Sequence, residues 1–246
     1  MKTQASRVQI LHCLDGARRA TGLAVIIDVF RAFTLAPCAF ARGVESILPV
    51  ATAEEALAMK RVDPALLLAG EHDGRPLPGF DFSNSPAAIL RAELAGRRLV
   101  LRTSAGVQGL LAAQGADEVI TGSFVNATAI VDYLRRRAPQ QVSLVCMGWN
   151  ARERTAEDEA CAEYLAAGLR SAFPDFAPVR ERLRADPSGA KFFDPARPWF
   201  PPEDFEVCMR ASAYPWVLRL ERDDAGRPRL RRAAPGAAAE GTHAAL

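Results

Sequence analysis

Short apolar runs alternate along this chain with longer segments of helical pattern, and this alternation constrains the fold more than any other feature. Residues 23–27 (LAVII) are apolar at all five positions, as expected of a strand buried on both faces of a sheet. Residues 34–42 then have a helical pattern that Gly43 ends. Strands that alternate with helices in this way predict an α/β fold with a mostly parallel sheet.

The same alternation continues as far as residue 172. It predicts further strands at residues 47–50, 65–69, 99–101, 119–120 and 142–146, and a long helix at 156–170. Pro49 places the strand at 47–50 at a sheet edge or makes it the start of a strand. Thr52, three residues before Glu55, has the capping-box pattern of a helix N-terminus.

An internal resemblance indicates a repeated unit. Residues 41–48 (ARGVESIL) resemble residues 113–120 (AQGADEVI), and each stretch follows a predicted helix. We therefore predict one domain over residues 1–222, with two similar, intertwined β-α-β-α units at about residues 20–95 and 96–172. Seven prolines between residues 174 and 202 predict an irregular covering segment at 173–222, which includes a short helix at 205–210 and a strand at 216–220. Residues 223–246 lack periodicity and are expected to form a mobile tail without function.

Composition excludes several classes of function. Lys and Arg number 31 against 29 Asp and Glu, and this net charge of +2 argues against a protein that covers nucleic acid. The chain has no apolar run of the ~18 residues that a membrane span needs, and its first seven residues are polar, so we expect a cytoplasmic protein. Five cysteines without a C-x-x-C pair predict free thiols, and three histidines exclude catalysis by several histidines.

Polar residues follow the predicted strands, where ligands bind in open α/β sheets. They are Asp28 and Arg31 after 23–27, Glu71 after 65–69, Thr103, Ser104 and Gly106 after 99–101, and Ser123 and Asn126 after 119–120. Acids, arginine, hydroxyls and glycines together suit an oxyanion bound by arginine and N–H donors, beside a hard cation bound by carboxylates.

Several of these residues also have a purely structural interpretation. Asp28 could cap the helix that follows it, and Arg31 could form an ion pair. Ser85 could cap a helix that begins at Pro86. The residue types alone leave these alternatives open.

Taken in order, the segments resemble the 2-phosphosulfolactate phosphatase family, which acts in coenzyme M biosynthesis. The resemblance rests on residues 27–32 (IDVFRA), 47–50 (ILPV), 70–71 (GE), 79–81 (GFD), 84–86 (NSP), 122–124 (GSF), 126–127 (NA), 157–158 (ED) and 161–162 (CA). It is strong over residues 25–169 and weak over 204–210. It implies a magnesium-dependent hydrolase that converts 2-phosphosulfolactate to sulfolactate and phosphate, on an α/β scaffold of two intertwined units.

The resemblance also implies residue roles. Asp28, Arg31 and Glu71 are the expected catalytic residues, and Asp28, Glu71 and Asp158 the expected ligands of Mg²⁺. Arg31 and seven further residues would bind phosphate, carboxylate and sulfonate oxygens: Asn84, Ser85, Thr103, Ser104, Gly106, Ser123 and Asn126. The expected partner is a small anionic phosphorylated substrate, without nucleic acid or membrane. A monomer and a homo-oligomer are both open alternatives, because no sequence pattern distinguishes them.

Three loops depart from the family pattern. Residues 33–35 (FTL) replace a run of threonines, Ala105 replaces an asparagine, and His72 replaces an arginine. These changes leave as alternatives a non-hydrolytic oxyanion-binding protein, an enzyme for another phosphorylated substrate, and a lyase or transferase. An aspartyl-phosphate mechanism would require a D-x-D motif after the first strand. Phe30 stands where the second aspartate of that motif would be, which disfavours this mechanism. His72 is a candidate proton donor to the leaving group.

Overall fold

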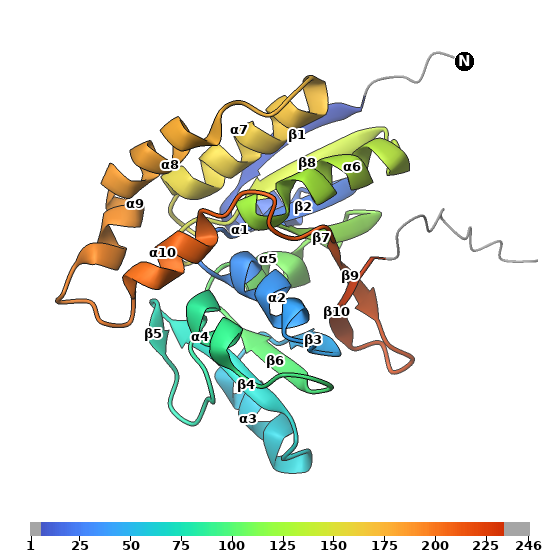
Figure 1. Cartoon of the computed structure of the whole chain (residues 1–246). Helices are drawn as coiled ribbons and strands as arrows, with labels where there is room; N and C mark the ends of the chain where they lie inside the picture. Colours follow the sequence, from blue (N-terminus) through green and yellow to red (C-terminus); the bar gives the residue numbers. More distant parts are fainter. Residues whose placement is uncertain (1–5, 234–246) are drawn as a thin grey trace, which may run out of the picture.

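Ten strands make up the sheet at the centre of the structure (Figure 1). The computed structural model describes residues 6–233, and its strands and helices confirm the predicted α/β class. The strands are β1 (Arg7–His12), β2 (Leu23–Ile27), β3 (Ser46–Pro49), β4 (Leu67–His72), β5 (Arg75–Pro76), β6 (Arg98–Arg102), β7 (Glu118–Gly122), β8 (Gln141–Cys146), β9 (Leu218–Arg222) and β10 (Pro228–Arg232). Their order across the sheet is β1-β8-β2-β7-β9-β10-β3-β6-β4-β5.

Helices connect and cover these strands. They are α1 (Cys13–Arg18), α2 (Ala32–Ala41), α3 (Ala53–Val62), α4 (Pro86–Arg91), α5 (Gly106–Ala112), α6 (Ala127–Arg137), α7 (Ala156–Arg170), α8 (Phe176–Ala185), α9 (Pro187–Ala190) and α10 (Pro202–Cys208), with 3-10 turns η1 (Phe124–Asn126) and η2 (Lys191–Phe193). The bounds of α7 are those predicted, and α2 begins two residues before its predicted start. Thr52 caps α3 as predicted, because its hydroxyl accepts the N–H of Glu55 at 3.1 Å.

The sheet consists of two parallel groups of strands joined by an antiparallel hairpin. In one group β2 pairs with β7 and β8, and in the other β6 pairs with β3 and β4. Strands β2, β3 and β4 come from the first predicted unit, whereas β6, β7 and β8 come from the second. Each unit therefore contributes strands to both groups, and this exchange is the intertwining that the sequence predicts.

The two groups share a central hydrophobic core. One cluster of buried side chains combines Ile26 of β2 and Leu101 of β6 with residues of α2 and α5, which lie between the groups in Figure 1. A second cluster packs α6 and α7 against β2 and β8, and a third packs α3 against β4 and β6. The shared cluster fixes the two groups relative to each other, because close-packed interiors resist displacement.

The predicted irregular segment at 173–222 is wrong over much of its length, since it contains α8, α9 and α10. Pro187 and Pro202 each occupy the first turn of a helix, where the missing N–H has no intrahelical partner in any case. The prolines therefore start helices here instead of breaking them. The helix predicted at 205–210 corresponds to α10, and the strand predicted at 216–220 to β9.

The prediction of a mobile tail at 223–246 is also wrong where the structure describes it. Residues 228–232 form β10, which pairs with β9 and meets β3 at Leu230 and Ile47. Leu230 is completely buried. This segment thus occupies the middle of the sheet, while residues 234–246 of the predicted tail lie outside the described residues.

Three smaller differences concern strand positions. Pro49 ends β3, an internal strand, and its missing N–H is tolerated because β10 bridges β3 only at Ile47. The strand predicted at 65–69 continues to His72 and turns back into β5, so Glu71 lies on a strand. β1 and α1 were not predicted from the sequence.

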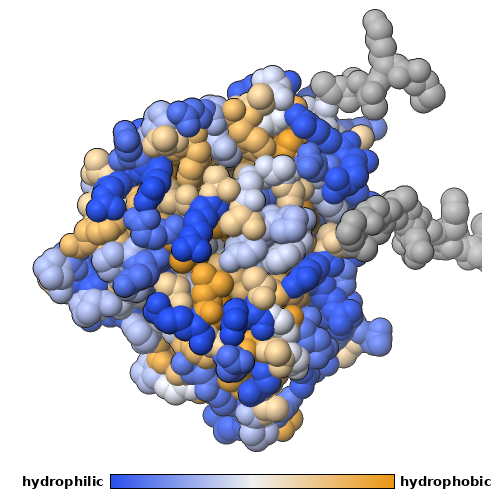
Figure 2. Space-filling model, in the orientation of Figure 1, coloured by the Kyte–Doolittle hydropathy of each residue, from blue (hydrophilic) through white to orange (hydrophobic). Residues whose placement is uncertain are grey.

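The described surface is mixed in character. Figure 2 shows hydrophilic residues over most of one face, with apolar residues between them. Val62, 88% exposed, and Ile10 are the large apolar side chains most open to solvent within residues 6–233, and isolated residues of this kind are ordinary. No helix within this range is long and apolar enough to cross a membrane.

Candidate active site

A small cavity lies where residues that end or follow four strands meet. Its lining comes from both parallel groups: Asp28 and Phe30 after β2, Glu71 and Gly74 at the end of β4, Ser104 and Ala105 after β6, Gly148, Trp149 and Asn150 after β8, together with Asn84 and Phe200. The groups are in direct contact here, because the N–H of Gly106 donates to Asp28 Oδ2 at 2.8 Å. Of the residues expected to surround one cavity, Asp28, Glu71 and Ser104 of the Thr103 turn therefore meet here, whereas Arg31 and Thr103 do not line it.

Asp28 is a buried acid held by two backbone donors. Its Oδ1 accepts the N–H of Ala32, the first residue of α2, at 3.1 Å, so the capping alternative holds alongside its place in the cavity. Burial raises the pKa of Asp28 to about 7, although both N–H donors lower it. The carboxylates of Glu71 and Glu157 add to the rise. Asp28 thus sits in surroundings that favour either a proton or a cation.

Glu71 is held in the same manner from the other group of strands. Its Oε1 accepts the N–H of Ser104 at 2.6 Å, and its Oε2 accepts the N–H of Gly74 at 2.7 Å. Gly74 has a φ of +76°, and a Cβ there would lie 2.2 Å from Cζ of Phe200. Only glycine fits this turn without displacement, so the donor to Glu71 depends on it.

Two further acids lie in the first turn of α7. Asp158 Oδ1 accepts the N–H of Val29 and its Oδ2 that of Gly148, both at 2.8 Å, which ties the loop after β2 to the loop after β8. Burial raises the pKa of Asp158 well above its usual range, and Glu157 and Asp28 add to that rise. Glu157 is buried, and its Oε2 has no hydrogen-bond partner.

These acids fit a divalent cation, but not as a closed cage. Within residues 6–233 no three side chains of the His, Cys, Asp or Glu type converge on one point suited to a metal ion. Mg²⁺ is commonly bound by one or two carboxylates, with waters and substrate phosphate completing its shell. Burial raises the pKa of Asp28, and Oε2 of the buried Glu157 has no hydrogen-bond partner, so a cation would stabilise these groups. Asp28 and Glu71 line the cavity, whereas Asp158 does not.

Arg31 forms the ion pair that the sequence left as an alternative. Its Nη1 donates to Asp204 Oδ2 at 2.7 Å and to the carbonyl of Trp199 at 2.8 Å. Its Nη2 donates to the carbonyl of Gly74 at 3.0 Å, while its Nε has no partner. Arg31 therefore positions the turn whose N–H holds Glu71, and it is itself almost completely buried.

Other predicted residues divide between cavity and scaffold. Asn84 lines the cavity, and its Oδ1 has no hydrogen-bond partner. Ser104 lines it too, with its hydroxyl 3.4 Å from Glu71 Oε2. Gly106 orients Asp28, and a Cβ at that position would lie 2.6 Å from Asp28 Oδ2.

Two of the predicted hydroxyls accept a backbone N–H in the first turn of a helix. Ser85 accepts the N–H of Ala88 at 3.1 Å, which confirms its capping alternative, and donates to Asp204 Oδ1 at 2.6 Å. Thr103 accepts the N–H of Val107, in the first turn of α5, at 3.1 Å. Neither residue lines the cavity.

Ser123 and Asn126 are not brought to the cavity. Ser123 Oγ bonds with the hydroxyl of Thr34 at 2.7 Å, and Asn126 Nδ2 donates to the carbonyl of Trp216 at 3.3 Å. The segment at 212–217 covers the end of β7, as the N–H of Tyr214 bonded to the carbonyl of Val125 shows. His72 is also outside the cavity, with a side chain 67% exposed.

Sequence reasoning missed several residues of the site. Trp149, the third residue after β8, lies within a strand end that the sequence marks, but no role was predicted for it. Phe200 and the buried Lys191 come from the segment at 190–200, where no strand end or periodic pattern marks them. Their proximity to the acids is a tertiary effect.

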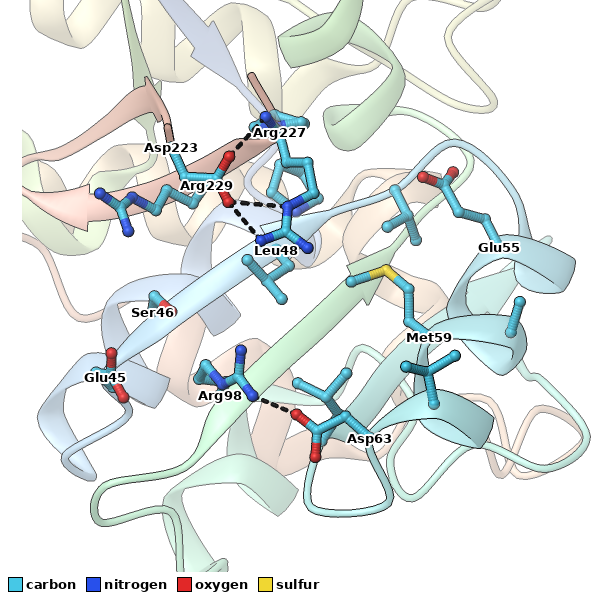
Figure 3. Close-up of a pocket in the computed structure, with 16 residues that line it drawn as sticks. Glu45, Ser46, Leu48, Glu55, Met59, Asp63, Arg98, Asp223, Arg227 and Arg229 are labelled. Atoms are coloured by element: carbon cyan, nitrogen blue, oxygen red, sulfur yellow. Dashed lines mark hydrogen bonds and ion pairs between the residues drawn. The ribbon is translucent and has the colours of Figure 1, made fainter. Parts of the chain in front are cut away.

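A larger groove lies elsewhere, between α3, β3 and the β9–β10 hairpin (Figure 3). Its volume is about 650 Å³. Several charged side chains there are paired with each other, Arg98 with Asp63 and Arg227 with Asp223. None of the acids that line the smaller cavity lines this groove. The smaller cavity is therefore the better candidate for the active site, although the groove has the larger volume.

Comparison with known proteins identifies the family of this chain. A family model described as 2-phosphosulpholactate phosphatase matches residues 11–188. A protein of Bacillus subtilis named "Probable 2-phosphosulfolactate phosphatase" is 30% identical over 81% of this chain and 87% of its own length.

Two further relatives carry the same name. The protein of Caldicellulosiruptor saccharolyticus is 34% identical over 62% of this chain and 64% of its own length. That of Deinococcus radiodurans is 38% identical over 59% of this chain and 62% of its own length, so these two matches span slightly less than two thirds of each relative. The resemblance seen in the sequence is confirmed: this chain belongs to the 2-phosphosulfolactate phosphatase family.

Proposed function

We propose that this protein is a cytoplasmic, magnesium-dependent phosphatase that hydrolyses the phosphate ester of a small anionic hydroxy acid. The names of its relatives support 2-phosphosulfolactate as the substrate, with sulfolactate and inorganic phosphate as products. The observation that carries the proposal is the meeting of Asp28, Glu71 and Ser104, from both groups of strands, in one cavity.

The acids of the cavity would hold the metal ion. Asp28 and Glu71 are the proposed ligands, because both line the cavity and backbone N–H groups fix the orientation of each carboxylate. Bound Mg²⁺ would offset the negative charge that develops on the phosphate oxygens as the ester bond breaks. Asp158 accepts the N–H groups of Val29 and Gly148 and so ties the loop after β2 to the loop after β8.

Polar groups of the cavity wall would bind the substrate. The Asn84 amide would donate through its Nδ2 to a substrate oxygen, and the hydroxyl of Ser104, which also contacts Glu71 Oε2, lies on the same wall. Water adds to phosphorus, the P–O ester bond breaks, and the hydroxy acid leaves as an alcohol. We do not assign proton donation to His72, because its side chain lies outside the cavity.

The test is phosphate release from a panel of phosphomonoesters with and without Mg²⁺. We expect Mg²⁺-dependent release with 2-phosphosulfolactate, and at least a 100-fold loss in Asp28→Asn, since that change removes a metal-ligating charge. Asp15→Asn is the matched control, because its side chain is 85% exposed and does not line the cavity. Sulfolactate binding without release from any ester would instead identify an oxyanion-binding protein. Products other than the free alcohol and phosphate would indicate a lyase or transferase.

A further inference from the structure

A buried lysine lies beside the cavity and has no oxygen partner. Lys191, in η2, is 8% exposed, and its ammonium group forms no hydrogen bond or ion pair with the other described residues. Lys191 does not itself line the cavity, but it packs against residues that do. Buried ammonium groups are normally paired, because their three N–H donors lose water on burial. Lys191 is one of only three lysines among the 31 basic residues of the chain, and it lies beyond the segment that the family model matches.

Aromatic rings surround this ammonium group. Its Nζ lies 4.9 Å from the ring centroid of Trp149, 5.0 Å from that of Phe200 and 5.8 Å from that of Phe30. These three residues also line the cavity. Ring faces stabilise a cation but accept no conventional hydrogen bond, so the N–H donors of Lys191 stay available to an anion.

None of the charged groups that the structure describes near Lys191 is bonded to its ammonium group, so a bound anion would have to be a ligand. Burial lowers its pKa, and the carboxylates of Glu157, Asp28 and Asp158 oppose that effect from a distance without forming an ion pair. The neighbouring cation, Arg31, is already bonded to Asp204 and to two backbone carbonyls. Lys191 is therefore a cation near the cavity that has no bonded anion within the described residues. Arg102, the other such cation, already donates to the carbonyl of Glu71 and the hydroxyl of Ser104.

We propose that Lys191 binds the acidic group that the substrate carries besides its phosphate, a carboxylate or a sulfonate, and so makes the enzyme select phosphate esters of acids. This inference rests on the proposed phosphatase function, because the cavity acids and their metal ion would serve the phosphate. Lys191 determines specificity here and takes no part in breaking the ester bond.

Three esters test the inference by steady-state kinetics. They are 2-phosphosulfolactate, 2-phospholactate, which lacks the sulfonate, and propane-1,2-diol 2-phosphate, which has a hydroxymethyl group in place of the carboxylate as well. We expect wild-type kcat/KM for the acid-bearing esters to exceed that for the diol ester by at least about tenfold, as for one charged hydrogen bond. Lys191→Met should raise KM for the acids about 10- to 100-fold, leave kcat within a few-fold, and spare the diol ester.

Two variants are the controls for this measurement. Lys60→Met makes the same chemical change at a lysine paired with Asp81 on the far side of β4, and it should keep the full preference. Lys191→Arg keeps the charge and should retain more of the preference than Lys191→Met. Equal losses on all three esters in Lys191→Met would show a merely structural role and overturn the inference. Absence of a preference in the wild-type enzyme would overturn it as well, whether or not the variant folds.

Binding of sulfolactate, measured by calorimetry, separates this inference from the proposed function. We expect Lys191→Met to weaken this binding at least tenfold, and Lys60→Met to leave it unchanged. Wild-type protein that hydrolyses none of the esters, but binds sulfolactate through Lys191, would refute the phosphatase and keep the anion site. Hydrolysis of the esters together with unchanged sulfolactate binding in Lys191→Met would support the phosphatase and refute the anion site at Lys191.

Discussion

Arg31 and Asp204, 173 residues apart in the chain, form an ion pair of 2.7 Å between two side chains that are completely buried. Asp204 also accepts the hydroxyl of Ser85 and the N–H of Ala87, so it joins α10 to the start of α4. Through Arg31 the same network reaches Gly74 and the donor of Glu71. The pair thus connects three distant segments around the cavity.

Loss of one partner should be costly. Asp204→Ala leaves Arg31 as an uncompensated buried charge, and we expect it to lower the free energy of unfolding by about 3–5 kcal/mol. Urea denaturation measures this change. Asp194→Ala, which breaks the exposed pair with Arg197, is the control and should cost less than about 1 kcal/mol. Similar effects of the two variants would contradict the role given to the buried pair.

Gly106→Ala should weaken metal binding. Its Cβ would lie 2.6 Å from Asp28 Oδ2, so the carboxylate must move and loses its fixed orientation. We expect the Mg²⁺ concentration for half-maximal activity to rise by about tenfold or more, as when a residue that orients a ligand is changed. Gly115→Ala, whose Cβ has its nearest contact at 3.2 Å from the carbonyl of Ala20, should leave this concentration unchanged.

The raised pKa of Asp28 predicts a pH dependence of stability in protein free of divalent cations. The folded protein binds this proton more tightly than the unfolded chain does, so the contribution of Asp28 is complete below about pH 4 and lost as the pH rises to about 7. At about 1.4 kcal/mol for each tenfold change in proton affinity, the upper limit is roughly 4 kcal/mol. Thermal unfolding at pH 5 and pH 8 should therefore show Asp28→Asn gaining stability relative to the wild type at the higher pH. A constant difference would refute the assignment.

Mg²⁺ should stabilise the wild-type protein against unfolding. At a concentration 100 times the dissociation constant, a ligand bound only by the folded state contributes about 2.7 kcal/mol. Differential scanning calorimetry with Mg²⁺ and then with excess chelator measures the change in Tm. Asp28→Asn should show a much smaller change and Asp15→Asn the full one. If both variants respond as the wild type does, the cation binds elsewhere.

Leu230→Ala should destabilise the fold by about 2–5 kcal/mol, as for other large-to-small changes in a core. Leu230 is completely buried where β10 meets β3. Val62→Ala, at a position 88% exposed, is the control and should change the free energy of unfolding by less than about 0.5 kcal/mol. A negligible effect at Leu230 would support the tail predicted from the sequence.

The sequence predicts residues 23–172 well because the signals there are local. β2 is apolar over its whole length, and Thr52 and Ser85 cap helices with their own hydroxyls. β10 gives no such signal, since its buried Leu230 stands between Arg229 and Arg231. Arginine side chains can keep their charged ends in water while their stems cover apolar surface, so a strand in the middle of a sheet can look polar.

The same difference between local and tertiary signals decides which residues of the candidate site could be predicted. Asp28, Glu71 and Ser104 could be found because the carboxyl ends of parallel strands collect ligand-binding groups. Ser123 satisfies the same rule but is completely buried, and its hydroxyl bonds with that of Thr34 in α2. Lys191 satisfies no local rule, and its relation to the cavity comes from the rings around it.

The position of the β9–β10 hairpin has a consequence for synthesis of the protein. β7 and β3 are joined only through these two strands, which follow the other strands of the described chain. A growing polypeptide therefore exposes two open strand edges from the time β8 emerges until residue 232 is made, roughly 4–17 s at ~5–20 residues per second. Unpaired edges are templates for association with other chains. Association through these edges in that interval would divert chains from the native fold.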